Sequence, residues 1–139
     1  NLEKEKKIID ILLQLHTKNL LTAAHDISDG GLLTAICEML FKDNLGLNLN
    51  LPKSLLKIDS KDPTLHSWCF GEDQGRIIVA TDKIDKVKIC LKDYNLDYFV
   101  LGKTNASNNL NLNDITTISI TSLKNSNERT LPLIMGKDK

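Results

Sequence analysis

Residues 23–32, reading Ala-Ala-His-Asp-Ile-Ser-Asp-Gly-Gly-Leu, are the stretch that most constrains the fold of this chain. The apolar run from Leu20 to His25 predicts a strand, and the periodic apolar residues from Leu32 to Phe41 predict a helix. Between them, Ser28-Asp29-Gly30-Gly31 has the composition of a tight turn. The stretch therefore predicts a strand–turn–helix unit.

This turn carries the first group of candidate ligand-binding residues. Backbone N–H groups at the start of a helix are unpaired and, together with the helix dipole, favour an anion such as phosphate. The two glycines let a ligand approach the backbone, and at least one is expected to have a positive φ. Asp26 and Asp29 could ligate Mg²⁺, and His25 could donate a proton or a hydrogen bond. The alternative is a plain turn in which Ser28 or Asp29 caps the helix.

A second polar turn, Gly71-Glu72-Asp73-Gln74-Gly75-Arg76, precedes a strand predicted over residues 76–81. The planar guanidinium of Arg76 suits a phosphate or a carboxylate, and Glu72 could bind a metal or pair with Arg76. The alternative is a solvated loop whose surface ion pair contributes little to stability. Because both polar turns lie at strand ends, they could share one edge of a sheet.

The other helices follow from apolar spacing. They are expected over residues 3–18, over residues 83–94 and, as one short helix, after Thr121 and before Pro132. Asn19 is expected to end the first helix, and Asp82 to cap the second. Residues 53–70 are expected to be irregular or short-helical, with a turn at Asp62-Pro63.

The remaining strands are expected over residues 45–51, 98–101 and 115–120. In the first of these, leucines alternate with glycine and asparagine, which is typical of a strand with one buried face. The Asn-rich segment 105–113 is interpreted as a hairpin connection. Helices and strands in this mixture predict an α+β fold, a mixed β-sheet flanked by helices, in one domain over residues 1–139.

Composition excludes some classes of function. Lys and Arg number 18, as do Asp and Glu, so no basic field exists to bind nucleic acid, and no apolar run has the length of a membrane span. Cys37, Cys69 and Cys90 lack metal-ligand spacing, which indicates packing roles and free thiols in a cytoplasmic protein. The chain begins without Met, so a fragment of a larger chain or a processed product is expected.

The motif of residues 25–32, followed by Glu38, resembles the synthetase subunit of formylglycinamide ribonucleotide amidotransferase, in particular the second of its two C-type domains. Residues 45–51 are similar to the strand that follows in that family. Residues 72–76 are similar to its Glu-Ser-Gln-Gly-Arg segment, with Asp73 in place of serine; the preceding glycine also replaces a common serine.

The resemblance implies a reaction, cofactors and partners. The whole enzyme uses ATP and Mg²⁺ to activate the formamide oxygen of its ribonucleotide substrate, and ammonia from glutamine then displaces phosphate to leave an amidine. The implied partners are upstream synthetase domains of the same chain, a separate glutaminase subunit and a small accessory subunit, in the cytoplasm. Neither nucleic acid nor a membrane is an expected partner.

The resemblance also assigns site residues. In this family the catalytic histidine and the main ATP-binding segments lie in other domains, so no residue here is expected to be catalytic. The second C-type domain lines a pseudo-symmetric site that could hold a structural nucleotide. Asp26 and Glu72 are the expected metal ligands. The expected ligand-facing residues are His25, Asp26, Ser28, Asp29, Gly30, Gly31, Glu72, Gln74 and Arg76.

Two other functions stay open at this point. The chain could be a scaffold domain whose sites have decayed, contributing only interface and stability. It could also belong to a kinase-like relative that transfers phosphate to a small molecule.

Overall fold

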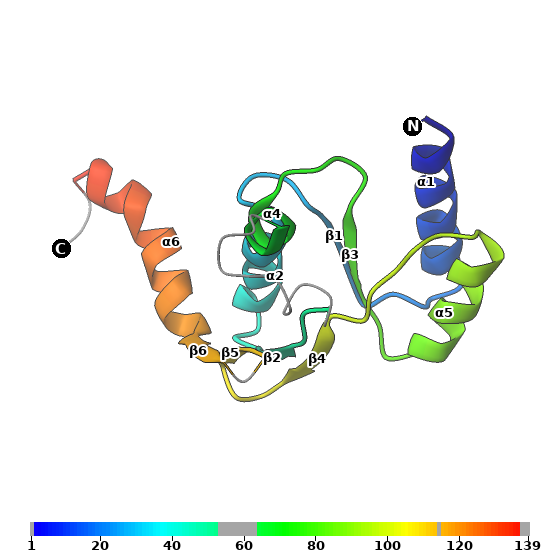
Figure 1. Cartoon of the computed structure of the whole chain (residues 1–139). Coiled ribbons are helices and arrows are strands. Elements are labelled where there is room, and N and C mark those ends of the chain that lie inside the picture. Colours follow the sequence, from blue (N-terminus) through cyan, green and yellow to red (C-terminus); the bar gives the residue numbers. More distant parts are fainter. Residues whose placement is uncertain (1, 53–63, 114, 137–139) are drawn as a thin grey trace.

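A computed structural model describes residues 2–52, 64–113 and 115–136 (Figure 1). The turn expected at Asp62-Pro63 lies outside these residues. The elements in chain order are α1 (Leu2–Thr17), β1 (Ala23–Asp26), α2 (Gly31–Phe41), β2 (Gly46–Leu49), α4 (Thr64–Phe70), β3 (Ile77–Ala80), α5 (Ile84–Asp93), β4 (Gly102–Asn105), β5 (Asn109–Leu112), β6 (Thr116–Ser119) and α6 (Ile120–Ile134).

The described strands form two sheets. The larger has the order β4-β2-β5-β6, and β2 runs antiparallel to β4 and parallel to β5, so this sheet is mixed. The smaller is a two-stranded antiparallel ribbon of β1 and β3, in register from Ala23 opposite Ala80 to Asp26 opposite Ile77. The predicted α+β fold with a mixed sheet and flanking helices is confirmed.

The main core lies between α2 and one face of the four-stranded sheet. Leu47 and Leu49 of β2 are buried while Asn48 between them is exposed, as the alternation predicts. Ten buried residues make up this core: Ile27, Leu32, Ala35, Ile36, Leu40, Leu47, Leu49, Ile78, Leu110 and Ile120. We call this body, with α2, α4, α6 and the larger sheet, the main lobe.

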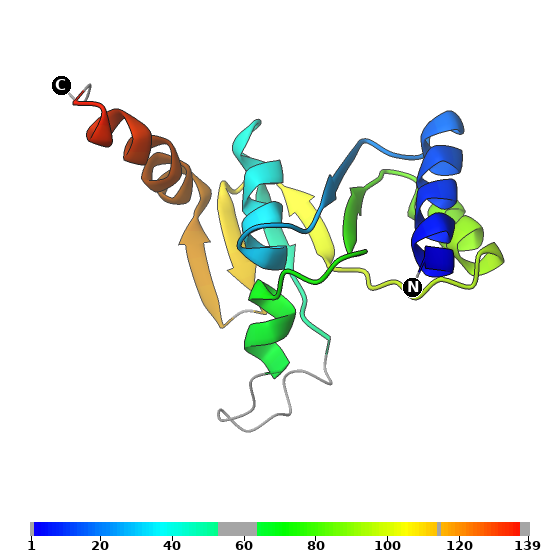
Figure 2. The same ribbon diagram turned by 90° about the horizontal axis from the view of Figure 1, so that it is seen from above.

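A second, smaller core joins α1 to α5. It consists of Ile11, Leu15, Leu20, Val87 and Cys90. Figure 2 shows α1 and α5 packed together on one side of the β1–β3 ribbon, with α2 and the larger sheet on the other. We call the α1–α5 pair and the loop residues that pack on it the small lobe.

Two of the strand predictions are wrong. Residues 98–101 do not belong to a strand, although the carbonyl of Leu101 accepts a hydrogen bond from the N–H of Asn50 at 2.7 Å, and the strand begins only at Gly102, where β4 meets β2. The segment 105–113 is not a hairpin connection, because β2 lies between β4 and β5. Leu110 is buried in the main core opposite Leu47, so burial of this leucine recruits the Asn-rich segment into the sheet.

Two of the helix predictions are also corrected. Helix α6 is longer than expected and passes through Pro132, which lies in its last turn and has no N–H to donate to the carbonyl four residues earlier. Helix α5 has no side-chain cap. Instead of Asp82, Thr81 accepts a hydrogen bond at Oγ1 from the N–H of Lys83, at 2.9 Å.

Asparagines end several elements. Asn19 follows α1 with φ 51°, which confirms the predicted stop, and four other asparagines take the same left-handed conformation. Asparagine tolerates this conformation better than most residues because its short side chain bonds locally to the backbone. None of the described helices has the length and apolar character needed to cross a membrane.

Candidate functional site

The two polar turns meet at one end of the β1–β3 ribbon. Because the strands are antiparallel, the end of β1 lies beside the start of β3. The N–H of Ile27 donates to the carbonyl of Arg76 at 3.0 Å, and the N–H of Gly30 donates to Oε1 of Glu72 at 2.9 Å. The prediction that both turns share one sheet edge is therefore confirmed, although the sheet is the small ribbon.

The turn between β1 and α2 depends on both glycines. Gly30 has φ 79° and Gly31 has φ 74°, so the predicted positive φ is present twice. A Cβ on Gly31 would lie 2.5 Å from the carbonyl carbon and 2.6 Å from the Cα of Phe70, at the end of α4. The backbone conformation and this close approach both exclude a side chain at residue 31.

The turn is not capped in the way predicted. Gly30 is the N-cap of α2 and offers no side-chain cap, so capping by Ser28 or Asp29 is wrong. The N–H of Gly31 instead donates to the backbone carbonyl of Ser28 at 3.0 Å. Glu72, from the second turn, supplies the acceptor for Gly30 that a capping side chain would otherwise provide.

These contacts change how the helix start can bind an anion. The amides of Gly30 and Gly31 already have partners within the chain, and Gly31 is buried. In this conformation the groups that face solvent at the turn are Ser28 and the carboxylates of Asp26 and Asp29. A phosphate here would need a bridging cation, because bare carboxylates repel it.

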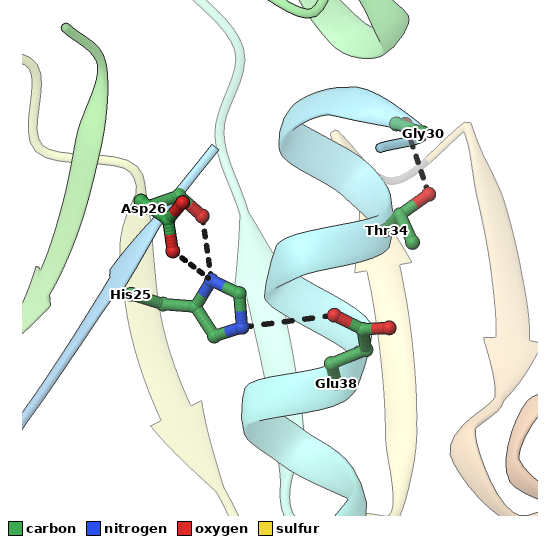
Figure 3. A network of polar contacts seen from close by, with 5 residues as sticks. All are labelled: His25, Asp26, Gly30, Thr34 and Glu38. Carbon is green, nitrogen blue, oxygen red and sulfur yellow. Dashed lines mark hydrogen bonds and ion pairs between the residues drawn. The ribbon is translucent and has the colours of Figure 1, made fainter. Parts of the chain in front are cut away.

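His25 lies between two carboxylates, as Figure 3 shows. Its Nε2 is 3.6 Å from Oε2 of Glu38 on α2, and its Nδ1 is 3.7 Å from Oδ1 of Asp26 and 2.5 Å from the Asp26 carbonyl oxygen. One turn before Glu38, Thr34 donates its hydroxyl to the carbonyl of Gly30 at 2.9 Å. The imidazole thus connects the end of β1 to α2.

Arg76 points back toward α4. Its guanidinium donates to the carbonyls of Trp68 and Gly71, at 2.8 and 3.3 Å, and lies 3.4 Å from Oδ2 of Asp73. It also lies over the indole of Trp68, 5.8 Å from the ring centroid. The ion-pair partner of Arg76 is therefore Asp73 and not Glu72, which accepts from Gly30.

The exposed rim of the site is acidic. Asp26, Asp29, Glu72 and Asp73 are all exposed, as is Gln74. Within the part of the chain that is described, no three His, Cys, Asp or Glu side chains come together as a metal site. A Mg²⁺ ion held by one or two carboxylates commonly completes its shell with water and phosphate oxygens, and that donor set fits the rim.

Two cysteines lie close to the site without being part of it. Burial, and then the charge of Glu38, raises the pKa of the Cys37 thiol. Burial raises the pKa of Cys69 and outweighs Arg76, which lowers it. Cys90 is buried and, like the other two, free, so the predicted packing role fits all three.

Helix α4 supplies a part of the site that the sequence does not reveal. Phe70 and Trp68 contact the turns through their backbones, and Trp68 also does so through its ring. A backbone contact does not depend on the type of residue, so the sequence cannot indicate it. Thr34 was missed as well. Its position four residues after Gly30 at the start of a helix is the signal that could have indicated it.

Comparison with protein families places this fold. Residues 1–115 match the family described as AIR synthase related protein, C-terminal domain. Because the match extends over most of the chain, the chain belongs to this family. Strand β6 and helix α6 lie beyond the matched residues.

The relatives in this family include phosphoribosylformylglycinamidine synthase subunit PurL. The protein of that name from Sinorhizobium fredii (strain NBRC 101917 / NGR234) is 36% identical over 140 residues, which cover 99% of this chain and 18% of the relative. The one from Aquifex aeolicus is 35% identical over 106 residues, 75% of this chain and 13% of the relative. The chain thus spans less than a fifth of the length of these relatives.

Solved structures agree on the fold. T. maritima PurL complexed with FGAR superposes with a TM-score of 0.68 at 23% identity, covering 86% of this chain and 21% of that chain. T. maritima PurL complexed with ATP gives a TM-score of 0.68 at 22% identity over the same shares. At these identities the similarity establishes a common fold.

Proposed function

We propose that the chain is the C-terminal domain of the synthetase subunit of formylglycinamide ribonucleotide amidotransferase, and that its two turns form one wall of a phosphate-ligand site. The observation that carries the proposal is the bond from Gly30 N–H to Glu72. It joins two polar motifs 42 residues apart in the sequence at one ribbon end. The relatives named phosphoribosylformylglycinamidine synthase subunit PurL support the same assignment.

The proposed site binds phosphate through a cation. Asp26 and Glu72 would hold Mg²⁺, which neutralises the rim and presents a positive charge to a nucleotide phosphate. Glu72 keeps free lone pairs while it accepts from Gly30, because a carboxylate has about four acceptor sites. The other residues proposed for the site are His25, Ser28, Asp29, Gly30, Gln74 and Arg76, together with Gly31, which is buried and would act by shaping the turn.

No residue of this chain is proposed as catalytic. In the full protein the chain would be a single domain over residues 1–139, packed against upstream synthetase domains that supply the reacting groups. ATP with Mg²⁺, a separate glutaminase subunit and a small accessory subunit would complete the cytoplasmic enzyme. The relative solved as PurLQS from Thermotoga maritima supports the presence of partner subunits.

The sharpest test of the proposed phosphate site removes the charge of Glu72. In the full-length protein, Glu72→Gln keeps an oxygen that can accept from Gly30 and removes only the negative charge. We expect the purified variant to retain less nucleotide than wild type when both are denatured and the released nucleotide is measured by chromatography. Asp43→Asn, at an exposed position outside both turns, is the matched control and should retain as much as wild type.

Turnover provides a second test. The 139-residue chain, given FGAR, ATP with Mg²⁺ and ammonium, should show no amidine formation, because the reacting groups are proposed to lie elsewhere. Product above a no-protein blank would contradict this assignment.

The scaffold alternative has one specific observation in its favour. Arg76 bonds to the carbonyls of Trp68 and Gly71 and pairs with Asp73, which is how a structural arginine behaves. If Glu72→Gln and Asp43→Asn retain equal nucleotide and melt at equal temperatures, the turns are a structural joint only, and the scaffold function takes precedence.

A further inference from the structure

A groove runs along the outer side of α5 and the segment after it. It has a volume of about 310 Å³ and is lined by Lys88, Ile89, Lys92, Asn95, Leu96 and Tyr98. Helix α5, which supplies Lys88, Ile89 and Lys92 of the lining, lies across the ribbon from α2 and α4 (Figures 1 and 2), so the groove is separate from the site proposed above.

The groove exposes apolar surface that the small core does not use. Helix α5 already buries Val87 and Cys90 against α1. Ile89 nevertheless remains 63% exposed and Tyr98 45% exposed beside it in the groove. Exposed apolar side chains gathered in a hollow with polar edges are typical of an interaction site, and tyrosine is enriched at such sites.

The polar edge of the groove is positive. Lys88 and Lys92 are four residues apart on α5, which makes them neighbours on the helix surface and mutually repulsive. Neither lysine forms an ion pair with any described residue, and Asp85, one turn earlier on the same helix, does not neutralise them by contact. Two unpaired like charges beside an apolar strip complement a ligand that carries carboxylates.

We propose that this groove docks a short acidic segment of a protein partner. An apolar side chain of the segment would rest on Ile89 and Tyr98, and its carboxylates would pair with Lys88 and Lys92. A nucleic acid would need a wider basic field than two lysines on a chain with 18 basic and 18 acidic residues. The apolar anchors also favour a peptide over a free anion.

The test uses the ¹⁵N-labelled chain and an acetylated, amidated pentapeptide, Glu-Leu-Glu-Leu-Glu. We expect saturable amide shifts at Ile89, Asn95 and Tyr98. Lys88→Glu with Lys92→Glu should weaken binding by at least about tenfold, because attraction becomes repulsion. The matched control, Lys42→Glu with Lys86→Glu, reverses two exposed charges outside the groove and should change binding by less than about twofold.

A further variant and a second peptide separate the apolar from the charged contribution to binding. Ile89→Ala should lower the affinity for the peptide, and far-UV circular dichroism should show that the variant is folded. The peptide Glu-Ser-Glu-Ser-Glu should bind to the wild-type chain more weakly than the leucine peptide does. Equal binding of the two acidic peptides, equal loss in both charge variants, or shifts that map outside the groove would overturn the proposal. Co-sedimentation with phosphatidylserine vesicles, in the absence of peptide binding, would overturn it in favour of a membrane surface.

Discussion

The two lobes of this chain differ in the size of their buried cores. The main lobe packs around ten buried core residues, supplied by helices, by the four-stranded sheet, by the turn after β1 and by β3, whereas the small lobe has five, supplied by two helices and the loop after α1. Burial of apolar area is the dominant favourable term in folding, so the smaller core should open more readily. The β1–β3 ribbon links the two lobes, and the candidate site lies at the end of this ribbon beside the main lobe.

This difference bears on function. The turns that hold Gly30 and Glu72 are anchored to α2 and α4, which belong to the better-packed lobe. The small lobe carries the groove on α5, a surface for association. A ligand wall needs preorganised groups, whereas a docking surface tolerates adjustment, so the unequal packing matches the two proposed roles.

Core truncation should separate the lobes most clearly. Leu49 and Leu15 are 0% and 1% exposed, one in each core, and truncation of a buried leucine to alanine costs roughly 2–5 kcal/mol. Leu49→Ala should shift the urea midpoint read by Trp68, which packs on the main core. Leu15→Ala should chiefly speed hydrogen exchange in α1 and α5. Equal exchange in α2 and α5 of wild type would contradict the comparison.

Glycine replacement tests how tightly the site is held by the main lobe. Gly31→Val should cost on the order of 1–3 kcal/mol from backbone strain, and more from overlap with Phe70. Gly75 also has a positive φ, but the nearest atom to an added Cβ is 3.9 Å away. Gly75→Ala should therefore cost only the strain of about 1–2 kcal/mol. Thermal melts of equal midpoint for both variants would show that the contact with Phe70 is unimportant.

Arg76 should prove more important for stability than a surface ion pair. Its hydrogen bonds to Trp68 and Gly71 hold the end of α4, and bonds from a charged group contribute about 1.5–3 kcal/mol each when buried. Because Arg76 is 24% exposed, we expect Arg76→Ala to lose roughly 1–2 kcal/mol, with partial recovery in Arg76→Lys. Asp73→Asn is the control, and urea unfolding should show a smaller loss. An unchanged urea midpoint in Arg76→Ala would contradict a structural role for Arg76.

The smallest expected effect concerns the Cys37 thiol beside the site. Its pKa is raised by burial and by the charge of Glu38, so the reactive thiolate is scarce near pH 8. Glu38→Gln removes only the second cause, and the rate of alkylation by iodoacetamide should rise modestly. The buried Cys69 serves as the internal reference, since its environment does not include Glu38. Equal acceleration of both thiols would indicate loosening of the fold instead.

The sequence by itself determined the elements with strong periodicity and the positions that need special backbone geometry. The strand–turn–helix unit, the alternating leucines of β2 and the stop at Asn19 all follow from local rules, because period and left-handed conformation are properties of neighbouring residues. The positive φ of Gly30 and Gly31 belongs to the same group.

Only the tertiary structure decided which residues meet. The pairing of Glu72 with Gly30 and of Arg76 with Asp73, the burial of Leu110 and the use of α4 backbone at the site depend on contacts between distant segments. Local propensity carries no information about such contacts, because a carboxylate can accept from whichever donor packing brings within reach. The division of the sheet into a ribbon and a four-stranded layer was decided in the same way, since strand order depends on which faces the helices cover.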